Sequence, residues 1–265
     1  MKKATVILIL ILLLAMTAIP AAAITWGQPD TEHPYVGAMV VDWPGYGPWQ
    51  LCSGTLIHPQ LFLTASHCTA DLDAYGIETV WVNFDQDSMN LGTLLDVSQV
   101  ITHPDYWWGP TSDPHDVAIL VLAEPVAGIT PAVLPELGYM NGLRDQGVLK
   151  NGSERAPLIA VGYGGKMDFP PPQIYYEDMR EWSTLSYQGL NNAWIRASQN
   201  LALGNGGTCF GDSGGPIFYQ EEDGTEVLVG VTSWGDAQCV SMGFYYRVDI
   251  SQTLDFIADV EASLP

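Results

Sequence analysis

The chain has 265 residues, 47% of them hydrophobic, and carries 30 Asp and Glu against 9 Lys and Arg, a formal net charge of -21. The apolar fraction suffices for a large core in one or two domains. Because so acidic a chain is repelled by phosphate backbones and anionic lipid surfaces, nucleic acids and such membranes are excluded as partners.

The first 23 residues have the three-part pattern of a secretory signal. Lys2 and Lys3 precede an apolar run from Val6 to about Ala15, and residues 21–23 are alanines. An uncleaved membrane anchor is the alternative, since the run is only slightly too short to span a bilayer, but the flanks match the three-part pattern of a signal. We therefore expect cleavage after Ala23 and a secreted, extracellular chain with no stable membrane association.

Short β-strands are expected from Tyr35 to Leu122. This segment alternates apolar runs with Pro, Gly, Asn and Asp, which is typical of a β-sandwich or barrel, and its helical periodicity is weak. The runs are Val36–Val41, Leu51–Ile57, Leu61–Ala65, Val80–Phe84, Leu94–Ile101 and Val117–Leu122.

A second set of strands is expected after a connector rich in Pro and Gly, from Pro125 to Gly152. The chain should end in an amphipathic helix from Asp249 to about Ala262, because apolar residues recur on one face and Asp249 can cap the first turn. The expected strands are Leu158–Val161, Met179–Leu185, Trp194–Ala197, Ile217–Tyr219, Val227–Thr232 and Phe244–Val248.

Residues 208–216 read TCFGDSGGP and contain the candidate nucleophile, Ser213. Glycines permit backbone conformations closed to other residues, so N–H groups can converge beside the serine. Acyl transfer needs such groups, because its tetrahedral intermediate carries an oxyanion. The alternative is a serine in a turn without chemistry, and the presence of a base and its orienter elsewhere decides between them.

Both partners have candidates upstream. His67 lies in the run LTASHC at 63–68, and Asp116 opens the apolar run DVAILVL at 116–122. With these motifs in the order His67, Asp116, Ser213, the chain resembles the chymotrypsin/trypsin-like serine endopeptidases from Ile24 to its C-terminal helix. Unrelated serine hydrolases use other orders.

The resemblance implies an all-β fold of two six-stranded antiparallel barrels with a C-terminal helix. The first barrel would lie within residues 24–145 and carry His67 and Asp116. The second would lie within 146–265 and carry Ser213.

The same resemblance assigns the chemical roles. Ser213 would be the nucleophile, His67 the general base and then general acid, and Asp116 the group that orients the imidazole. The N–H groups of Gly211 and Ser213 would form the oxyanion hole, and Ser233 would donate to Asp116. Because a histidine base must be neutral, activity should fall in acid.

Four cysteines in an exported chain suggest two disulfides, and the residues alone leave three pairings open. The family resemblance selects Cys52–Cys68 and Cys209–Cys239, each pinning a catalytic loop. No cysteine pair has the two-residue spacing of zinc ligands, and the acidic run at 83–87 matches no strong calcium template. We expect no metal and no cofactor.

In the family, a newly generated N-terminal Ile or Val inserts its ammonium beside the Asp that precedes the nucleophile. Cleavage after Ala23 would place Ile24 at that terminus with Asp212 as its partner, so that signal removal completes the enzyme. Thr25 and Trp26 depart from the Val-Gly that the family usually has here.

The family resemblance also predicts the primary substrate pocket. Its floor is the residue six before the nucleophile, here Gly207, followed by Thr208, and Gly235 and Gly243 fall where pocket walls are glycine. Trypsin-like members carry Asp at the floor. With Gly207 there, an Arg or Lys side chain of the substrate would lack its usual counter-ion in this chain. We expect a large neutral side chain, apolar or aromatic, before the scissile bond. Asp236 near the rim is interpreted as a solvated acid, with attraction of a basic group as the alternative.

The chain is thus predicted to be a secreted, monomeric serine endopeptidase that acts on proteins or peptides. Trp107 and Trp108 would border the cleft, where substrate contact and packing are equal alternatives. One rival is a catalytically inactive relative that serves as a binding protein. Another is an esterase or lipase, but the chain lacks the strand–helix alternation and the Gly-x-Ser-x-Gly elbow of that fold.

Overall fold

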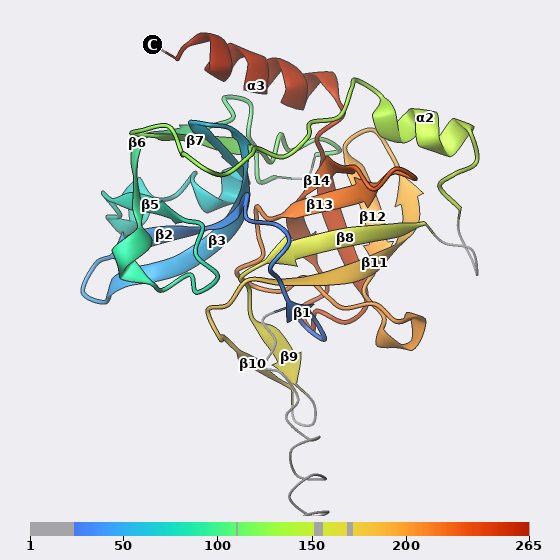
Figure 1. The fold of residues 1–265 in the computed structure, drawn as a ribbon, viewed down its shortest axis with the longest axis horizontal. Helices are drawn as coiled ribbons and strands as arrows, with labels where there is room; N and C mark the ends of the chain where they lie inside the picture. Colours follow the sequence, from blue (N-terminus) through green and yellow to red (C-terminus); the bar gives the residue numbers. More distant parts are fainter. Residues whose placement is uncertain (1–23, 110, 151–155, 169–171, 265) are drawn as a thin grey trace, which may run out of the picture.

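The computed structural model describes residues 24–109, 111–150, 156–168 and 172–264. The predicted signal at 1–23 lies outside the described residues. Two β-barrels lie side by side, with helix α3 across the top of Figure 1. Within the described part of the chain, no helix has both the length and the apolarity needed to cross a bilayer.

The first barrel is closed by six antiparallel strands in the order β2-β3-β4-β7-β6-β5. Strands β4 and β7 are buried along their whole length, which explains why their sequences are continuously apolar instead of alternating. The strands are Val36–Trp43 (β2), Gly47–His58 (β3), Leu61–Thr64 (β4), Val80–Asn83 (β5), Leu95–Thr102 (β6) and Ala118–Leu122 (β7).

The second barrel runs in the order β11-β12-β15-β14-β13-β8, is closed by pairing of β8 with β11, and carries β1 on its edge. Strand β11 alternates buried and half-buried residues throughout, as expected where one face lines the barrel core. The strands are Gln28–Pro29 (β1), Pro157–Gly162 (β8), Glu181–Leu190 (β11), Trp194–Ser198 (β12), Pro216–Gln220 (β13), Glu226–Gly235 (β14) and Met242–Arg247 (β15).

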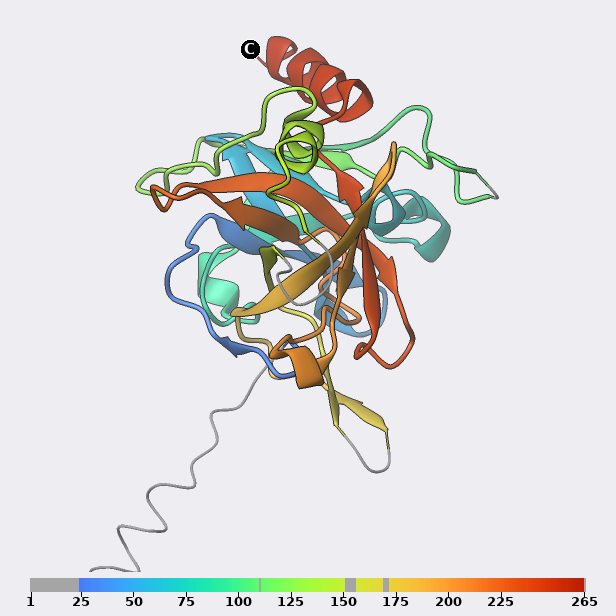
Figure 2. The same ribbon diagram turned by 90° about the vertical axis from the view of Figure 1, so that its right-hand side faces the viewer.

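The predicted fold class, two six-stranded barrels with a C-terminal helix, is confirmed. A helix and a hairpin are among the elements that were not expected from the sequence. A short helix, α2 (Tyr139–Asp145), lies in the connector. A hairpin of β9 (Lys166–Asp168) and β10 (Gln173–Tyr175) projects from the second barrel, as Figure 2 shows.

The segments that precede the first barrel and follow the second each pack on the barrel that is more distant in sequence. Ile24 packs into the apolar core of the second barrel, and β1 pairs with β11, although both precede the first barrel in sequence. At the other end, helix α3 (Ser251–Ala262) packs Phe256, Ile257 and Val260 into the cluster that holds the first-barrel core. Ile24 and β1 therefore contact the second barrel, and helix α3 contacts the first barrel.

Helix α3 begins at Ser251, later than the expected start at Asp249, and the predicted capping role of Asp249 was wrong. Ile250 occupies the N-cap position without a side-chain cap. Both oxygens of Asp249 instead accept from the buried guanidinium of Arg247, and one also accepts from the Met140 N–H. A charged donor outcompetes the helix N–H groups for this carboxylate.

A buried ionic cluster joins the two barrels. Arg180 donates to Asp30 at 2.7 Å and to the Val36 carbonyl of β2 at 3.2 Å. His33 places Nδ1 2.5 Å from Asp30 and Nε2 2.8 Å from Glu226 of β14. Burial alone would lower the pKa of His33, but the hydrogen bonds to Asp30 and Glu226 outweigh it and raise the pKa to about 9.

This cluster predicts a loss of stability in alkali. The folded pKa of His33 exceeds the ordinary value of 6.5, so its contribution is complete below about 6.5 and is lost as the pH rises through about 9. We expect His33→Gln to cost up to about 3 kcal/mol of unfolding free energy near pH 6 and less at high pH. Denaturant melts at both pH values measure this, with His58→Gln as the control. Equal costs of His33→Gln at both pH values contradict the assignment.

Candidate active site

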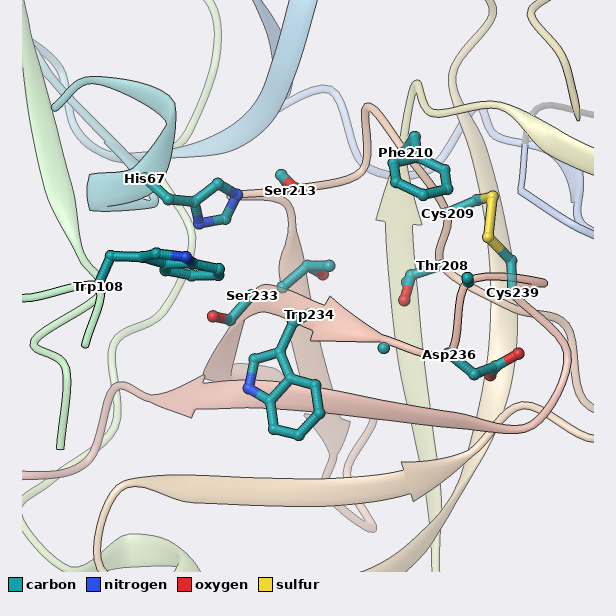
Figure 3. A pocket seen from close by; sticks show the side chains of 13 residues that line it. His67, Trp108, Thr208, Cys209, Phe210, Ser213, Ser233, Trp234, Asp236 and Cys239 are labelled. Atoms are coloured by element: carbon teal, nitrogen blue, oxygen red, sulfur yellow. A yellow bond between two sulfur atoms is a disulfide. The ribbon is translucent and has the colours of Figure 1, made fainter. Parts of the chain in front are cut away.

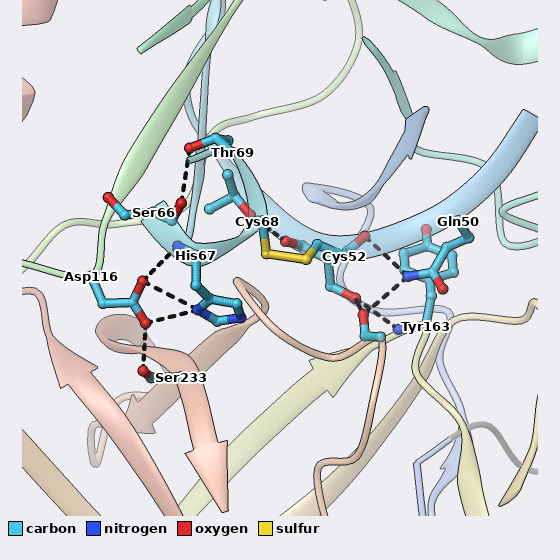
Figure 4. The surroundings of a disulfide bond; sticks show 12 residues. Gln50, Cys52, Ser66, His67, Cys68, Thr69, Asp116, Tyr163 and Ser233 are labelled. Carbon is cyan, nitrogen blue, oxygen red and sulfur yellow. Dashed lines mark hydrogen bonds and ion pairs between the residues drawn. A yellow bond between two sulfur atoms is a disulfide. The ribbon is translucent and has the colours of Figure 1, made fainter. Parts of the chain in front are cut away.

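A buried carboxylate anchors the site. Asp116 lies two residues before the start of β7 and has no exposed side-chain surface. Its Oδ2 lies 2.9 Å from Nδ1 of His67, and its Oδ1 accepts from the His67 main-chain N–H at 2.9 Å. Ser233 of β14 donates its hydroxyl to the same Oδ2 (Figure 4). The first barrel thus supplies the acid and the imidazole, and the second supplies the third donor.

The charge of Asp116 is stabilised by these donors. Burial would raise the pKa of the Asp116 carboxyl, but the charge and hydrogen bonds of His67 and the Ser233 hydroxyl outweigh burial and lower it. A carboxylate facing Nδ1 requires that Nδ1 carry the proton. The opposite ring nitrogen of His67, Nε2, is therefore left to accept a proton.

The position of His67 follows from local structure. Strand β4 ends at Thr64, and a single 3-10 turn, Ser66–Cys68, carries the histidine at its centre. The Ser66 hydroxyl donates to the Val117 carbonyl at 2.6 Å, which ties this turn to the segment that carries Asp116. The imidazole remains 21% exposed, so one edge of the ring faces solvent in the cleft.

Ser213 lies beside His67 in the hollow shown in Figure 3. Both residues also line a second hollow. The Ser213 carbonyl accepts from the Ser53 N–H of β3 at 2.8 Å, and the Gly214 N–H donates to the Thr232 carbonyl of β14 at 2.8 Å. The loop of the candidate nucleophile is therefore held between the two barrels, next to the histidine.

The orientation of the two peptide groups that precede Gly211 and Ser213 is fixed by hydrogen bonds to their carbonyl oxygens. The Phe210 carbonyl accepts from the Gly165 N–H at 2.7 Å, and the Asp212 carbonyl accepts from the Gly215 N–H at 2.8 Å. Because N–H and C=O point in opposite directions across a trans peptide, the N–H groups of Gly211 and Ser213 are directed away from these internal partners. This orientation suits an oxyanion hole.

Gly211 has a conformation that other residues rarely adopt. Its φ is +98°, and an added Cβ would lie 2.9 Å from the Cα of Gly164. Its carbonyl accepts from the side chains of Gln50 at 3.0 Å and Ser53 at 2.9 Å, both on β3. These contacts, which the sequence did not reveal, fix the loop that precedes Ser213.

The predicted contact between Ile24 and Asp212 is not present in this structure. Asp212 is fully buried and accepts from the N–H groups of Gly164 and Cys209, each at 2.8 Å, while burial raises its pKa to about 7. The nitrogen of Ile24 donates instead to Oε2 of Glu181 at 3.0 Å. Ile24 is joined to Ala23 here, so this nitrogen is an amide and not an ammonium.

Both predicted disulfides are present, Cys52–Cys68 and Cys209–Cys239. The first lies beside His67, and the second forms part of the wall of a hollow next to Ser213. Cys52, His67 and Cys68 bring ligand-type atoms within 4.8 Å of one another, but the two sulfurs are bonded to each other. A metal requires thiolates, so these three residues do not form a metal site.

A hollow of about 300 Å³ opens beside Ser213. Of the predicted pocket residues, Thr208 and Gly235 line it, whereas Gly207 and Gly243 are buried outside its lining. An added Cβ would lie 1.9 Å from the Cys239 carbonyl oxygen at Gly207 and 2.0 Å from the Tyr245 hydroxyl at Gly243. Both positions are therefore closed to any side chain.

The polar groups beneath this hollow are neutral. Thr208 Oγ1 accepts from Gln199 Nε2 at 2.7 Å and lies 3.2 Å from the Tyr245 hydroxyl. Gln199 comes from the segment after β12, and no sequence motif marked it. At the rim, the carboxylate of Asp236 accepts from the N–H groups of Val240, Ser241 and Met242, which are 2.8–3.2 Å away.

The cleft continues on both sides of Ser213. Trp108 also lines the first hollow, with its ring centroid 6.0 Å from that of His67 (Figure 3). Trp107 and Trp108 are 64% and 67% exposed and form an apolar shelf with Trp194 and Trp234. On the far side is a second hollow of about 430 Å³, and its aromatic lining residues are Trp43, Trp49, Tyr75, Tyr176 and Phe210.

Comparison with known proteins gives consistent similarities. The family model described as Trypsin matches residues 25–257. A mouse (Mus musculus) tryptase is 32% identical over 76% of this chain and 80% of its own. A trypsin of Saccharopolyspora erythraea is 30% identical over 82% of this chain and 88% of its own. An inactive CLIP domain-containing serine protease, A28 of Anopheles gambiae, is 32% identical over 70% of this chain and 49% of its own.

Proposed function

The chain belongs to the trypsin family of serine proteases, and we propose from this premise that it is an active, secreted endopeptidase that uses Ser213, His67 and Asp116. The observation that carries the proposal is the buried Asp116 carboxylate, which receives the His67 ring and the Ser233 hydroxyl at the edge of an open cleft. Export rests on the signal pattern of residues 1–23.

In the proposed reaction, Ser213 Oγ attacks the carbonyl carbon of the scissile peptide while His67 Nε2 takes the hydroxyl proton. Asp116 stabilises the imidazolium that forms, without taking the proton. The N–H groups of Gly211 and Ser213 bind the oxyanion. When the intermediate collapses, the imidazolium protonates the leaving amine, and an acyl ester remains on Ser213.

The second half of the reaction uses the same groups. His67 removes a proton from water, which attacks the acyl ester on Ser213 and forms another tetrahedral intermediate. Its collapse releases the carboxylic acid and returns the proton from His67 to the serine. Atoms balance with one water consumed for each peptide bond cleaved.

An inactive binding protein is the rival reading, since one of the relatives is named as inactive. Two features support activity in this chain. First, the Asp116 carboxylate is in hydrogen-bond contact with the His67 ring. Second, the carbonyls of Phe210 and Asp212 accept hydrogen bonds within the protein, so the N–H groups of Gly211 and Ser213 point the opposite way, as an oxyanion hole requires.

We expect a fluorophosphonate to label the purified chain at Ser213, and Ser213→Ala to abolish the label. Asp116→Asn should slow labelling by up to about 10^4-fold, because the imidazole is then held in the wrong tautomer. Mass spectrometry of the labelled peptide measures both, with the exposed Ser251→Ala as the control. An unlabelled wild-type chain, or equal labelling of Ser213→Ala, supports the binding protein. Hydrolysis of peptide amides separates a protease from an esterase, because an esterase cleaves simple esters and leaves the matched amides intact.

The pocket geometry supports a neutral residue before the scissile bond. A counter-ion cannot stand at position 207, because the Cys239 carbonyl occupies the space of its side chain. The base presents the Thr208 hydroxyl, bonded to Gln199 and Tyr245, and no charge. The one acid at the rim, Asp236, accepts three N–H groups of its own loop.

A peptide library should show a preference for large apolar or aromatic side chains before the scissile bond, by about tenfold or more in kcat/KM over Arg and Lys. Asp236→Asn should leave this preference unchanged, as should the exposed control Asp105→Asn. Cleavage confined to Arg and Lys, and lost in Asp236→Asn, would show instead that the rim acid reads a basic substrate.

A further inference from the structure

The apolar shelf next to the first hollow is built on four indoles, and two of them belong to both hollows. Trp108 and Trp234 line the hollow beside Ser213 (Figure 3) and also the shelf, where they enclose about 400 Å³ together with Trp107 and Trp194. The proposed function places the side chain before the scissile bond in the first hollow. The residues that precede it in an extended substrate would therefore run along the shelf, where indoles offer a large apolar contact area.

One wall of the shelf belongs to the second barrel and is held by aromatic packing. The indole of Trp234, on β14, stacks on the ring of Phe244, on β15, with the ring centroids 3.6 Å apart. The indole of Trp194, on β12, meets Trp234 edge to face at 6.1 Å. Because both indoles are supported by neighbouring rings, this wall has a defined position on the second barrel.

Tyr246 lies behind this wall. It is the register partner of Trp194 between β15 and β12, its ring meets the Trp194 indole edge to face at 5.6 Å, and it has no exposed surface. Its hydroxyl donates to Oδ1 of Asp113 at 2.5 Å. Burial and the hydrogen bond to Asp113 raise the pKa of the Tyr246 phenol, so the hydroxyl keeps its proton and remains the donor.

Asp113 belongs to the connection between β6 and β7 of the first barrel, which also carries the two indoles of the other wall. Its Oδ1 accepts from the His115 N–H at 3.2 Å as well. The Trp107 N–H donates at 3.1 Å to the carbonyl of Pro114, the residue after Asp113, so the backbone of Trp107 is tied to this point. The hydrogen bond between Tyr246 and Asp113 thus joins the two walls of the shelf.

We propose that Tyr246 is a positioning residue whose bond to Asp113 sets the distance between the two walls of the shelf, and thereby the selection of substrates with apolar residues ahead of the cleaved position. Tyr246 acts through the walls and does not touch the substrate. The inference deepens the proposed function and rests on it, since the shelf is assigned to the same substrate chain that Ser213 attacks.

The test compares two peptide amides with Phe before the scissile bond, one extended on its N-terminal side by Leu-Leu-Ala (the Leu peptide) and the other by Gly-Gly-Ala (the Gly peptide). Tyr246→Phe removes only the hydroxyl and keeps the ring against Trp194. Because a hydrogen bond to a charged group is lost, we expect the kcat/KM ratio of the Leu peptide to the Gly peptide to fall about fivefold or more, chiefly through KM. Tyr187→Phe, another buried tyrosine of the second barrel, is the control and keeps the wild-type ratio.

Variants of Asp113 test the same bond from the other wall. Asp113→Asn retains an oxygen that can accept from the Tyr246 hydroxyl, so its ratio should exceed that of Asp113→Ala, which has no acceptor. In a double-mutant cycle, Asp113→Ala and Tyr246→Phe together should lower the ratio no further than either alone, because both remove one bond. If Tyr246→Phe does not fold, the comparison of Asp113→Asn with Asp113→Ala decides. An equal fall in kcat/KM for both peptides would assign Tyr246 to the catalytic groups and overturn the proposal, as would an unchanged ratio.

Binding without cleavage separates this proposal from the protease activity. In the Ser213→Ala chain, the Kd of the Leu peptide, followed by tryptophan fluorescence, should rise about fivefold or more in Tyr246→Phe and stay unchanged in Tyr187→Phe. If the wild-type chain cleaves neither peptide but this rise in Kd is seen, the role of Tyr246 at the shelf stands and the proposed protease activity fails. A Kd that Tyr246→Phe leaves unchanged contradicts the proposal.

Discussion

At the cleft, the two barrels are joined by hydrogen bonds to the buried carboxylate of Asp116. Its donors come from both sides, His67 from the first barrel and Ser233 from the second. Stripping water from a charge is costly, so the carboxylate is stable there only while these donors stay in place. The hydrogen bonds to Asp116 therefore require the two barrels to keep their relative position at the cleft.

The rest of the molecule limits such shifts. Helix α3 packs on the first-barrel core, β1 pairs with the second barrel, and the cluster of Asp30, His33 and Arg180 joins strands of both. The segment that precedes the first barrel also pairs through Thr25 with Gly207, the residue before Thr208 of the pocket lining. The interactions that hold the barrels together thus also hold the catalytic groups and the substrate pocket in register.

Local patterns in the sequence predicted the strands of the two barrels. The family resemblance, and not the patterns, supplied the disulfide pairing and the candidate catalytic residues. Contacts between distant segments were not predictable in this way. Gly207 was expected to line the pocket, but the Cys239 carbonyl closes its position, and the Gln199 amide that supports Thr208 has no motif. Asp249 looked like a helix cap because its partner Arg247 could be identified only from the fold.

The central claim, that Ser233 acts on His67 through the buried Asp116, is tested most directly by a double-mutant cycle on fluorophosphonate labelling. A hydrogen bond to a charged group is worth enough for Ser233→Ala to slow labelling of the otherwise wild-type chain roughly tenfold or more. In the Asp116→Asn background the account predicts little further effect of Ser233→Ala. Two effects that simply multiply would show that Ser233 and Asp116 act independently, and would contradict it.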